Sequence, residues 1–248
     1  MSLSIVTVCM NRSHHLLQSA PRVAALTWHT EHLVVDWSSS QPLRREQLPP
    51  DPRLRLLRVE GEREWNLCRA YNFAVAQSRG ELILKLDADA WPAAPFDPRA
   101  PQLAVAGCPC AFGSGGEGRK GQMLLARSLF EAVGGFHELL VGYGFDDKEL
   151  RLRLTQLLAR EPAWIPADWL ELISHTDAER AGGPTGGGAL VASRGLATMR
   201  ASRLANRLVA AHAPWGAGAP PFQLHQGGWG EMAAGGRLPA PVGGRNRR

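Results

Sequence analysis

The sequence has few cysteines, no long apolar run and almost no acidic residues near its C-terminal end, and each shortage excludes a class of protein. The four cysteines are irregularly placed, and the Cys-Pro-Cys pair at 108–110 has no second Cys or His pair at finger spacing. Neither a disulfide scaffold nor a zinc finger is therefore expected. No run reaches about 18 consecutive apolar residues, which excludes a transmembrane helix. The first residues lack the basic start and long apolar core of a signal peptide, so we expect a cytoplasmic protein with reduced thiols.

The net charge of +5 is the sum of a basic C-terminal segment and a weakly acidic remainder. Residues 180–248 contain nine arginines and one acidic residue, Glu231, and carry +8, so that residues 1–179 carry −3. The basic character belongs to the tail, and the main domain is not expected to bind nucleic acid.

The first 175 residues alternate strand and helix patterns. Apolar runs such as "LSIVTVCM", "EHLVVDW", "LRLLRV" and "ELILKLD" predict strands, and "HHLLQSAPRVAAL" and "EREWNLCRAYNFAVAQ" between them predict helices. This alternation predicts an α/β fold with a mainly parallel sheet flanked by helices. Ligands of such sheets bind outside the carboxyl ends of the strands, where Asn11, Asp36 and Asp87 fall.

The pattern changes beyond residue 92. We expect one domain over residues 1–180, with a nucleotide-binding half over about 1–92 and an acceptor-side half over about 93–180, where "CPCAFGSGGEGRKG" predicts a loop that could act as a lid. Residues 181–248 form a tail rich in Gly, Pro and Arg, with 15 of the 27 glycines and one helix expected near 195–211. Two interpretations of that helix stay open: loose packing on the domain, or peripheral contact with an anionic membrane or lipid diphosphate.

Asp87 and Asp89 follow the apolar strand "LILKL" with one alanine between them. Alternate residues of an extended chain point to the same side, so the two carboxylates repel unless a cation lies between them. A hard divalent cation would satisfy both and could hold a diphosphate. A simple turn would explain the same residues equally well.

Three separated motifs resemble one family. "AYNFAVAQSRGELILKLDADAWP", with "NRSHHL" and "LVVDWSSS" before it, resembles the inverting family-2 glycosyltransferases with the GT-A fold, a Rossmann-like architecture. "LLARSLFEAVGGFHELLVGYGFDDKEL" resembles the acceptor-side module of β-1,4-galactosyltransferase-like enzymes. The resemblance covers about residues 3–178.

On the donor side, the resemblance implies a role for each matching residue. Asp87 would lie toward the ribose or the second shell of a metal, and Asp89 would bind the Mn²⁺ or Mg²⁺ that bridges the two phosphates. Asp36 would face the base, and the nucleotide pocket would be lined by Asn11, Arg12 and Asn72. Asn72 as a buried amide and Arg12 as a surface charge remain alternatives.

On the acceptor side, Asp147 matches the general base of the family and would take the proton of the acceptor hydroxyl. Asp146 would bind the acceptor sugar, although it also fits the start of a helix together with Glu149. Tyr143 stands where a Trp is usual and would be a platform for the sugar. His175 would be a further metal ligand, with an ordinary core or surface histidine as the alternative.

Four residues depart from the family pattern. Tyr71 and Ala74 stand where Arg and Gly are common around Asn72. Phe145 stands where a small Gly is usual, and Lys85 is an unexpected charge inside a strand, which should reach the sheet edge or a carboxylate. The expected activity is a metal-dependent, inverting transfer of a sugar from a nucleotide-sugar, with UDP-sugar favoured, to a glycan or glycoconjugate. A non-catalytic nucleotide-sugar- or glycan-binding module and, less favoured, a phosphohydrolase with an Asp-x-Asp nucleophile are the alternatives.

Overall fold

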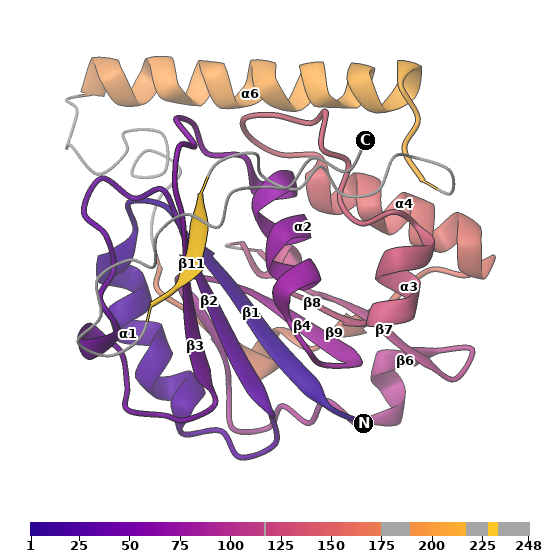
Figure 1. The fold of residues 1–248 in the computed structure, drawn as a ribbon. Coiled ribbons are helices and arrows are strands. Elements are labelled where there is room, and N and C mark those ends of the chain that lie inside the picture. The colour runs from indigo at the N-terminus through magenta and orange to yellow at the C-terminus, as the bar shows by residue number, and fades with distance from the viewer. Residues whose placement is uncertain (117, 175–188, 217–227, 233–248) are drawn as a thin grey trace, which may run out of the picture.

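The computed structural model describes residues 1–116, 118–174, 189–216 and 228–232, which form a central sheet with helices packed on both faces (Figure 1). Four parallel strands make its centre in the order β3-β2-β1-β4. They are β1 (Leu3–Cys9), β2 (Glu31–Trp37), β3 (Leu54–Val59) and β4 (Leu82–Asp87). In register, Val8 lies opposite Val35 and Asp87, and Cys9 lies opposite Asp36. The carboxyl ends of these strands are therefore level, as the sequence predicts.

Antiparallel strands extend the sheet beyond β4. They follow in the order β8 (Met123–Ala126), β7 (Cys108–Gly113) and β6 (Ala104–Val105), and β9 (Ala163–Ile165) runs parallel to β7. A separate pair is formed by β5 (Ala90–Pro92) and β10 (Leu170–Leu172). Short 3-10 turns span Arg45–Gln47, Pro101–Leu103, Arg119–Gly121 and Ala167–Trp169. The sheet is thus mixed but parallel at its centre.

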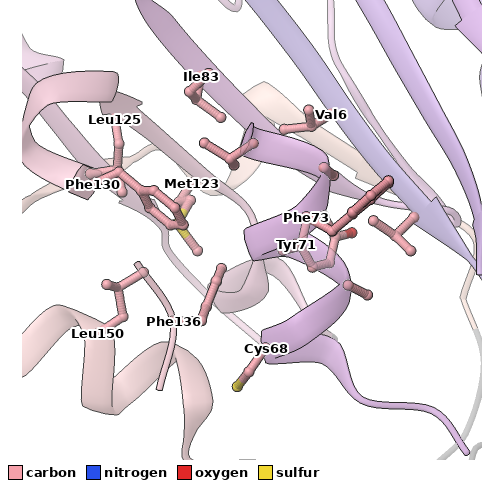
Figure 2. Close-up of a cluster of buried hydrophobic side chains, with 14 of the residues drawn as sticks. Val6, Cys68, Tyr71, Phe73, Ile83, Met123, Leu125, Phe130, Phe136 and Leu150 are labelled. Atoms are coloured by element: carbon pink, nitrogen blue, oxygen red, sulfur yellow. The ribbon is translucent and has the colours of Figure 1, made fainter. Parts of the chain in front are cut away.

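The alternation of side chains along β1 separates two cores. Val6 and Val8 point toward α2 (Leu67–Gln77), whose Tyr71 and Phe73 belong to the same apolar cluster (Figure 2). Ile5 and Cys9 point to the other face, which is covered by α1 (Ser13–Ala24). The remaining helices of this part are α3 (Arg127–Ala132) and α4 (Asp146–Leu158), which add Phe130 and Leu150 to the α2 cluster.

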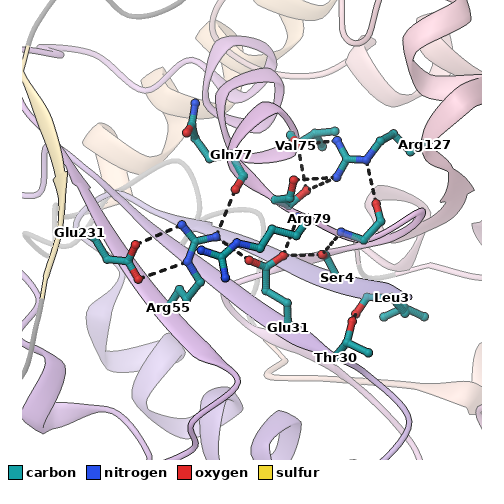
Figure 3. Close-up of polar contacts among 12 residues, drawn as sticks. Leu3, Ser4, Thr30, Glu31, Arg55, Val75, Gln77, Arg79, Arg127 and Glu231 are labelled. Atoms are coloured by element: carbon teal, nitrogen blue, oxygen red, sulfur yellow. Dashed lines mark hydrogen bonds and ion pairs between the residues drawn. The ribbon is translucent and has the colours of Figure 1, made fainter. Parts of the chain in front are cut away.

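The tail contributes more regular structure than its composition predicts. Its helix α6 spans Ala189–His212, longer than the segment expected near 195–211, and β11 (Trp229–Glu231) pairs with the free edge of β3. Glu231 forms an ion pair of 3.1 Å with Arg55 of β3, and Arg55 also contacts Glu31 at 2.6 Å (Figure 3). The described part of the tail therefore packs on the domain that precedes it.

The hydropathy of the described helices shows whether any of them could span a membrane. Within residues 1–116, 118–174 and 189–216, no helix is long and apolar enough to cross a bilayer.

Candidate active site

Asp87, the last residue of β4, is held by contacts on both carboxylate oxygens. Gln122 donates to Oδ2 from Nε2 at 2.8 Å, and its Oε1 accepts from the backbone N–H of Asp87, also at 2.8 Å. Lys85 Nζ donates to Oδ1 at 2.9 Å, and the Tyr71 hydroxyl lies 3.3 Å from the same oxygen. The side chain keeps 34% of its surface exposed, so that a polar atom of a ligand can still reach it.

Lys85 is a buried cation at the centre of the site. Its side chain is 2% exposed, and Nζ also donates to the carbonyl oxygen of Gly121 at 2.5 Å and lies 4.4 Å from the centre of the Tyr71 ring. Burial by itself lowers the pKa of the ammonium, but the Asp87 carboxylate, with Tyr71 and Asp147, raises that pKa above its ordinary value. Lys85 therefore stays protonated and reaches a carboxylate, one of the two outcomes predicted for it.

Gly121 is the point where the acidic residues of the two halves meet. A Cβ at this position would lie 3.0 Å from Asp87 Oδ2, 3.4 Å from Asp147 Oδ2 and 3.7 Å from Lys85 Nζ. Asp87 comes from the end of β4 and Asp147 from the first turn of α4. The absence of a side chain on Gly121 is what lets the two carboxylates lie this close together.

Asp146 and Asp147 begin α4 without capping it. The residue before the helix is Phe145, in a left-handed conformation with φ of 77°, and its side chain makes no capping hydrogen bond. Asp146 is thus the first residue of the helix, as its alternative role predicts, but it follows the N-cap and does not occupy it. Glu149, its expected partner, instead pairs with Arg153 at 2.6 Å. A left-handed φ is strained for Phe and easy for the Gly that the resemblance leads one to expect there.

The pKa values of both aspartates are shifted upward. Burial raises the pKa of Asp146, against the opposing effect of the Lys85 ammonium. Burial also raises the pKa of Asp147, and the neighbouring Asp146 carboxylate raises it further. Asp147 Oδ1 is buried without a hydrogen-bond partner among the described residues. A carboxylate with a raised pKa and a free oxygen is suited to accept a proton.

Asn11 and Asp36 shape the loop after β2. Asp36 is fully buried, and its oxygens accept from Arg58 at 2.7 Å and from the backbone N–H groups of residues 39 and 43. Asn11, at φ 57°, accepts from the backbone and hydroxyl of Ser40 at 2.8 and 2.9 Å. Arg12 directly precedes α1 and is partly exposed. The structure thus brings Asn11, Arg12 and Asp36 to the same end of the sheet.

A cavity of about 330 Å³ opens over this loop. It is lined by Ser13, Ser40, Gln41, Pro42, Leu43, Arg44 and Gln47. The loop residues that Asn11 and Asp36 hold, Ser40 and Leu43, are part of this lining, so these two polar side chains set the shape of the cavity.

Asn72 lies in the core and not at the opening of this cavity. Its side chain is fully buried, donates to Phe136 O and Glu138 Oε1 at 2.9 Å, and accepts from the N–H of Phe136 at 2.8 Å. These contacts fasten α2 to the loop before α4, which favours the buried-amide interpretation.

Tyr143 lies in a loop that α6 holds from outside. Its N–H donates to Ser202 Oγ at 2.7 Å, and the Arg203 guanidinium lies 5.6 Å from the centre of its ring. The side-chain oxygen of Asn206 accepts from the N–H of Val141 at 3.2 Å. The side-chain nitrogen of Asn206 donates to the carbonyl oxygen of Gly144 at 2.8 Å. Helix α6 therefore holds the chain that leads into Asp146 and Asp147.

Of the two predicted metal ligands, Asp89 and His175, only Asp89 lies within the described residues. Asp89 is half-buried in the turn after β4, and its carbonyl accepts from the N–H of Ile173 at 2.8 Å, which brings the segment before residue 175 alongside. His175 itself lies outside the described residues. In the described part of the chain, no three His, Cys, Asp or Glu side chains form a group that could hold a metal ion.

Three comparisons relate this fold to known proteins. No protein-family model and no curated protein sequence matches the chain. Among solved structures, it is similar to a mannosyltransferase from Pyrobaculum calidifontis in complex with GDP-Man and Mn²⁺, at a TM-score of 0.57 and 18% identity over 85% of this chain and 75% of the other.

Two further structures give the same result. Glucosyl-3-phosphoglycerate synthase from Mycobacterium tuberculosis, in complex with Mn²⁺, UDP and glucosyl-3-phosphoglycerate, matches at a TM-score of 0.56 and 14% identity over 81% of this chain and 79% of the other. The catalytic domain of Drosophila β1,4-galactosyltransferase 7, in complex with xylobiose, matches at 0.50 and 14% identity over 80% and 79%. The mixed, mainly parallel sheet flanked by helices is therefore the GT-A fold that these glycosyltransferases share.

Proposed function

We propose that this protein is a metal-dependent, inverting glycosyltransferase that moves a sugar from a nucleotide-sugar to a hydroxyl of a glycan or glycoconjugate. The observation that carries the proposal is the meeting of Asp87 and Asp147 over Gly121 in a chain with the GT-A fold. One carboxylate ends the central strand on the donor side, and the other starts the helix on the predicted acceptor side. An inverting transfer needs a group that binds the donor and a base that activates the acceptor within reach of the same sugar.

Asp147 is the proposed general base. Its raised pKa, caused by burial and by Asp146, makes it a stronger base than an exposed aspartate, and its Oδ1 is free to accept a proton. It would take the proton of the acceptor hydroxyl while that oxygen bonds to the anomeric carbon and the nucleoside diphosphate leaves from the opposite face. Asp146 and Tyr143 would orient the acceptor, as the galactosyltransferase-like motif around them implies.

The donor side would be bound by the end of the parallel sheet. The cavity lined by Ser13 and by residues between 40 and 47 has room for part of a nucleotide, and Asn11 and Asp36 hold the loop that lines it. Because Lys85 stays charged beside Asp87, it fixes that carboxylate for a hydrogen bond to the donor. A UDP-sugar is the favoured donor by family resemblance.

The site also offers the oxygen donors that Mn²⁺ and Mg²⁺ prefer. Asp89, with His175, would hold the ion, and donor phosphates and water would complete its ligands, since the described residues supply no group of three. When bound, the ion neutralises charge on the leaving diphosphate. The similar mannosyltransferase and synthase structures contain Mn²⁺ with a nucleotide, which supports the same assignment here.

Donor hydrolysis tests the proposal before any acceptor is known. The full chain would be incubated with UDP-, GDP- and dTDP-sugars in the presence of Mn²⁺ and then of EDTA, and release of nucleoside diphosphate would be measured. We expect release from one donor, its loss with EDTA and in Asp89→Ala, and no loss in Asp168→Ala, a matched exposed aspartate.

Each other outcome has a defined meaning. Metal-dependent nucleotide binding in a titration, without turnover of any donor, would favour the non-catalytic binding module. Release of phosphate from simple phosphoesters would favour the phosphohydrolase. Neither binding nor turnover would overturn the proposed function.

A further inference from the structure

Helix α6 has a face that packs on the domain and a face that is exposed. Toward the domain it presents Asn206, which is 4% exposed, and Ser202, both bonded to the loop over residues 141–144, and it packs Val209 and Ala210 on the core. Away from the domain, Leu204 is 60% and Leu208 is 53% exposed. The helix runs along the outside of the molecule above α2 and α4 (Figure 1). Of its apolar residues, Val209 and Ala210 pack against the core, whereas Leu204 and Leu208 lie on the solvent side without a described partner.

The exposed apolar residues form a continuous stripe. Residues at alternate spacings of four and three lie on one side of a helix, and those of the stripe are all exposed: Ala197, Ala201, Leu204, Leu208 and Ala211. Val141, which is 60% exposed and bonded to α6 through its backbone, adds an apolar side chain next to the helix.

Two arginines border the stripe. Arg200 and Arg207 lie about two turns apart along one flank, are exposed, and form no ion pair with any described residue. The sequence of α6 contains four arginines and no acidic residue. An apolar stripe bordered by arginines that form no ion pair within the described part of the chain is complementary to a surface that has an apolar interior and anionic head groups.

We infer that this face of α6, the stripe with Arg200 and Arg207, binds the surface of an anionic lipid bilayer. The leucines would enter the boundary between head groups and acyl chains, and the arginines would pair with lipid phosphates. A second copy of the chain fits less well, because a symmetric contact would bring the same arginines together without an acidic residue on the helix to pair with them. The sequence left open a peripheral contact between the tail and an anionic membrane, and this inference names the residues of α6 that would make it. The inference does not depend on the proposed activity.

Vesicle sedimentation of the full chain tests the inference. We expect binding to vesicles of phosphatidylcholine mixed with phosphatidylglycerol, and little binding to phosphatidylcholine alone. Each of Arg200→Gln and Arg207→Gln should weaken that binding about fivefold. The double variant Leu204→Ser/Leu208→Ser should weaken it at least about tenfold. Leu157→Ser and Arg160→Gln, which change exposed residues of the α4 end, are the matched controls and should bind like the wild type.

Three results would overturn the inference. They are no binding to either vesicle, equal loss of binding in the control variants, and binding to both vesicles alike. Light scattering supplies a further check, because a dimer that Leu204→Ser/Leu208→Ser abolishes would show that a second copy covers the face. Thermal unfolding of each variant confirms that it is folded, as expected for changes of exposed side chains.

Discussion

At the scale of single residues, the site is organised by one buried positive charge among several negative ones. Lys85 pairs with Asp87 and also opposes the upward pKa shifts of Asp146 and Asp147. Asp147 still keeps an oxygen without a partner among the described residues. A buried polar atom without a hydrogen-bond partner lowers stability, and buried groups with shifted pKa values gather at functional sites.

Replacement of Asp147 should separate catalysis from stability. Asp147→Asn keeps the shape of the side chain but removes the base, so kcat should fall by about 10²–10⁴. The variant also removes repulsion among Asp87, Asp146 and Asp147, so its Tm should equal or exceed that of the wild type. Transfer kinetics together with thermal unfolding measure both effects. Full activity in Asp147→Asn would exclude this residue as the base.

Gly121 should be sensitive to the smallest side chain. Gly121→Ala places a methyl group 3.0 Å from Asp87 Oδ2 and 3.4 Å from Asp147 Oδ2, so the Asp87 carboxylate must shift by a few tenths of an ångström. Because displacements of this size matter in an active site, we expect kcat to fall about tenfold or more with a stability loss of about 1–2 kcal/mol. Gly116→Ala, in the same loop with nothing within 4 Å, is the control. Equal effects of both changes would contradict this account of the site.

Two buried histidines should make the fold sensitive to acid. Burial and the Arg53 cation lower the pKa of His29 to about 4, and burial lowers that of His32 to about 3, both from 6.5. The unfolded chain therefore binds protons first, and stability is lost as the pH falls below about 6.5. The loss should be on the order of 3 kcal/mol for each histidine by pH 4.

Urea unfolding between pH 7 and pH 4 measures this dependence. His29→Gln should flatten the curve, because one of the two titrating groups is gone. An unchanged slope in that variant would assign the acid sensitivity to other groups.

At the scale of elements, α6 is a support for the loop that precedes α4. The Asn206 amide satisfies a donor on Val141 and an acceptor on Gly144, and its removal leaves both without their partner. Asn206→Ala should cost about 1–3 kcal/mol. If the loop binds the acceptor, the acceptor KM should rise severalfold while the donor KM is unchanged. His212→Gln, which changes an exposed residue of the same helix, controls for the helix itself. A rise of the donor KM alone would contradict the predicted role.

Some elements could be predicted from the sequence because their signals are local. Apolar runs predict the strand that ends at Asp87 and the helix before it. A parallel sheet places the carboxyl ends of β1, β2 and β4 at one edge. The meeting of Gly121 with Lys85 could not be predicted, since it joins residues 36 apart through a glycine-rich loop without periodicity. The left-handed turn before α4 could not be predicted either, because Phe145 adopts a conformation that its side chain disfavours.

At the scale of the whole molecule, the tail completes the sheet. The composition of residues 181–248 predicts little regular structure, yet Trp229 packs edge to face on Phe73 and β11 covers the edge of β3. Tertiary contacts of this kind have no local sequence signal. Low-complexity composition was therefore a poor guide to the packing of the described part.

Removal of residues 228–248 should expose that edge. The backbone groups of β3 would lose their partners in β11, and an open strand edge promotes association. We expect a lower Tm and turbidity that rises with protein concentration, measured by thermal unfolding and light scattering. A chain that ends at residue 232 keeps β11 and should behave like the full chain. Similar aggregation of both truncated chains would instead assign the effect to the residues after 232.

The pairing of β11 with β3 also has a consequence for synthesis. Arg55 and Glu231 are 176 positions apart, so a ribosome makes the outermost strand of the sheet long after its neighbour. The nascent domain must carry an uncovered edge through most of its translation. The interval before residue 231 leaves the ribosome is then the period in which this chain most needs a chaperone.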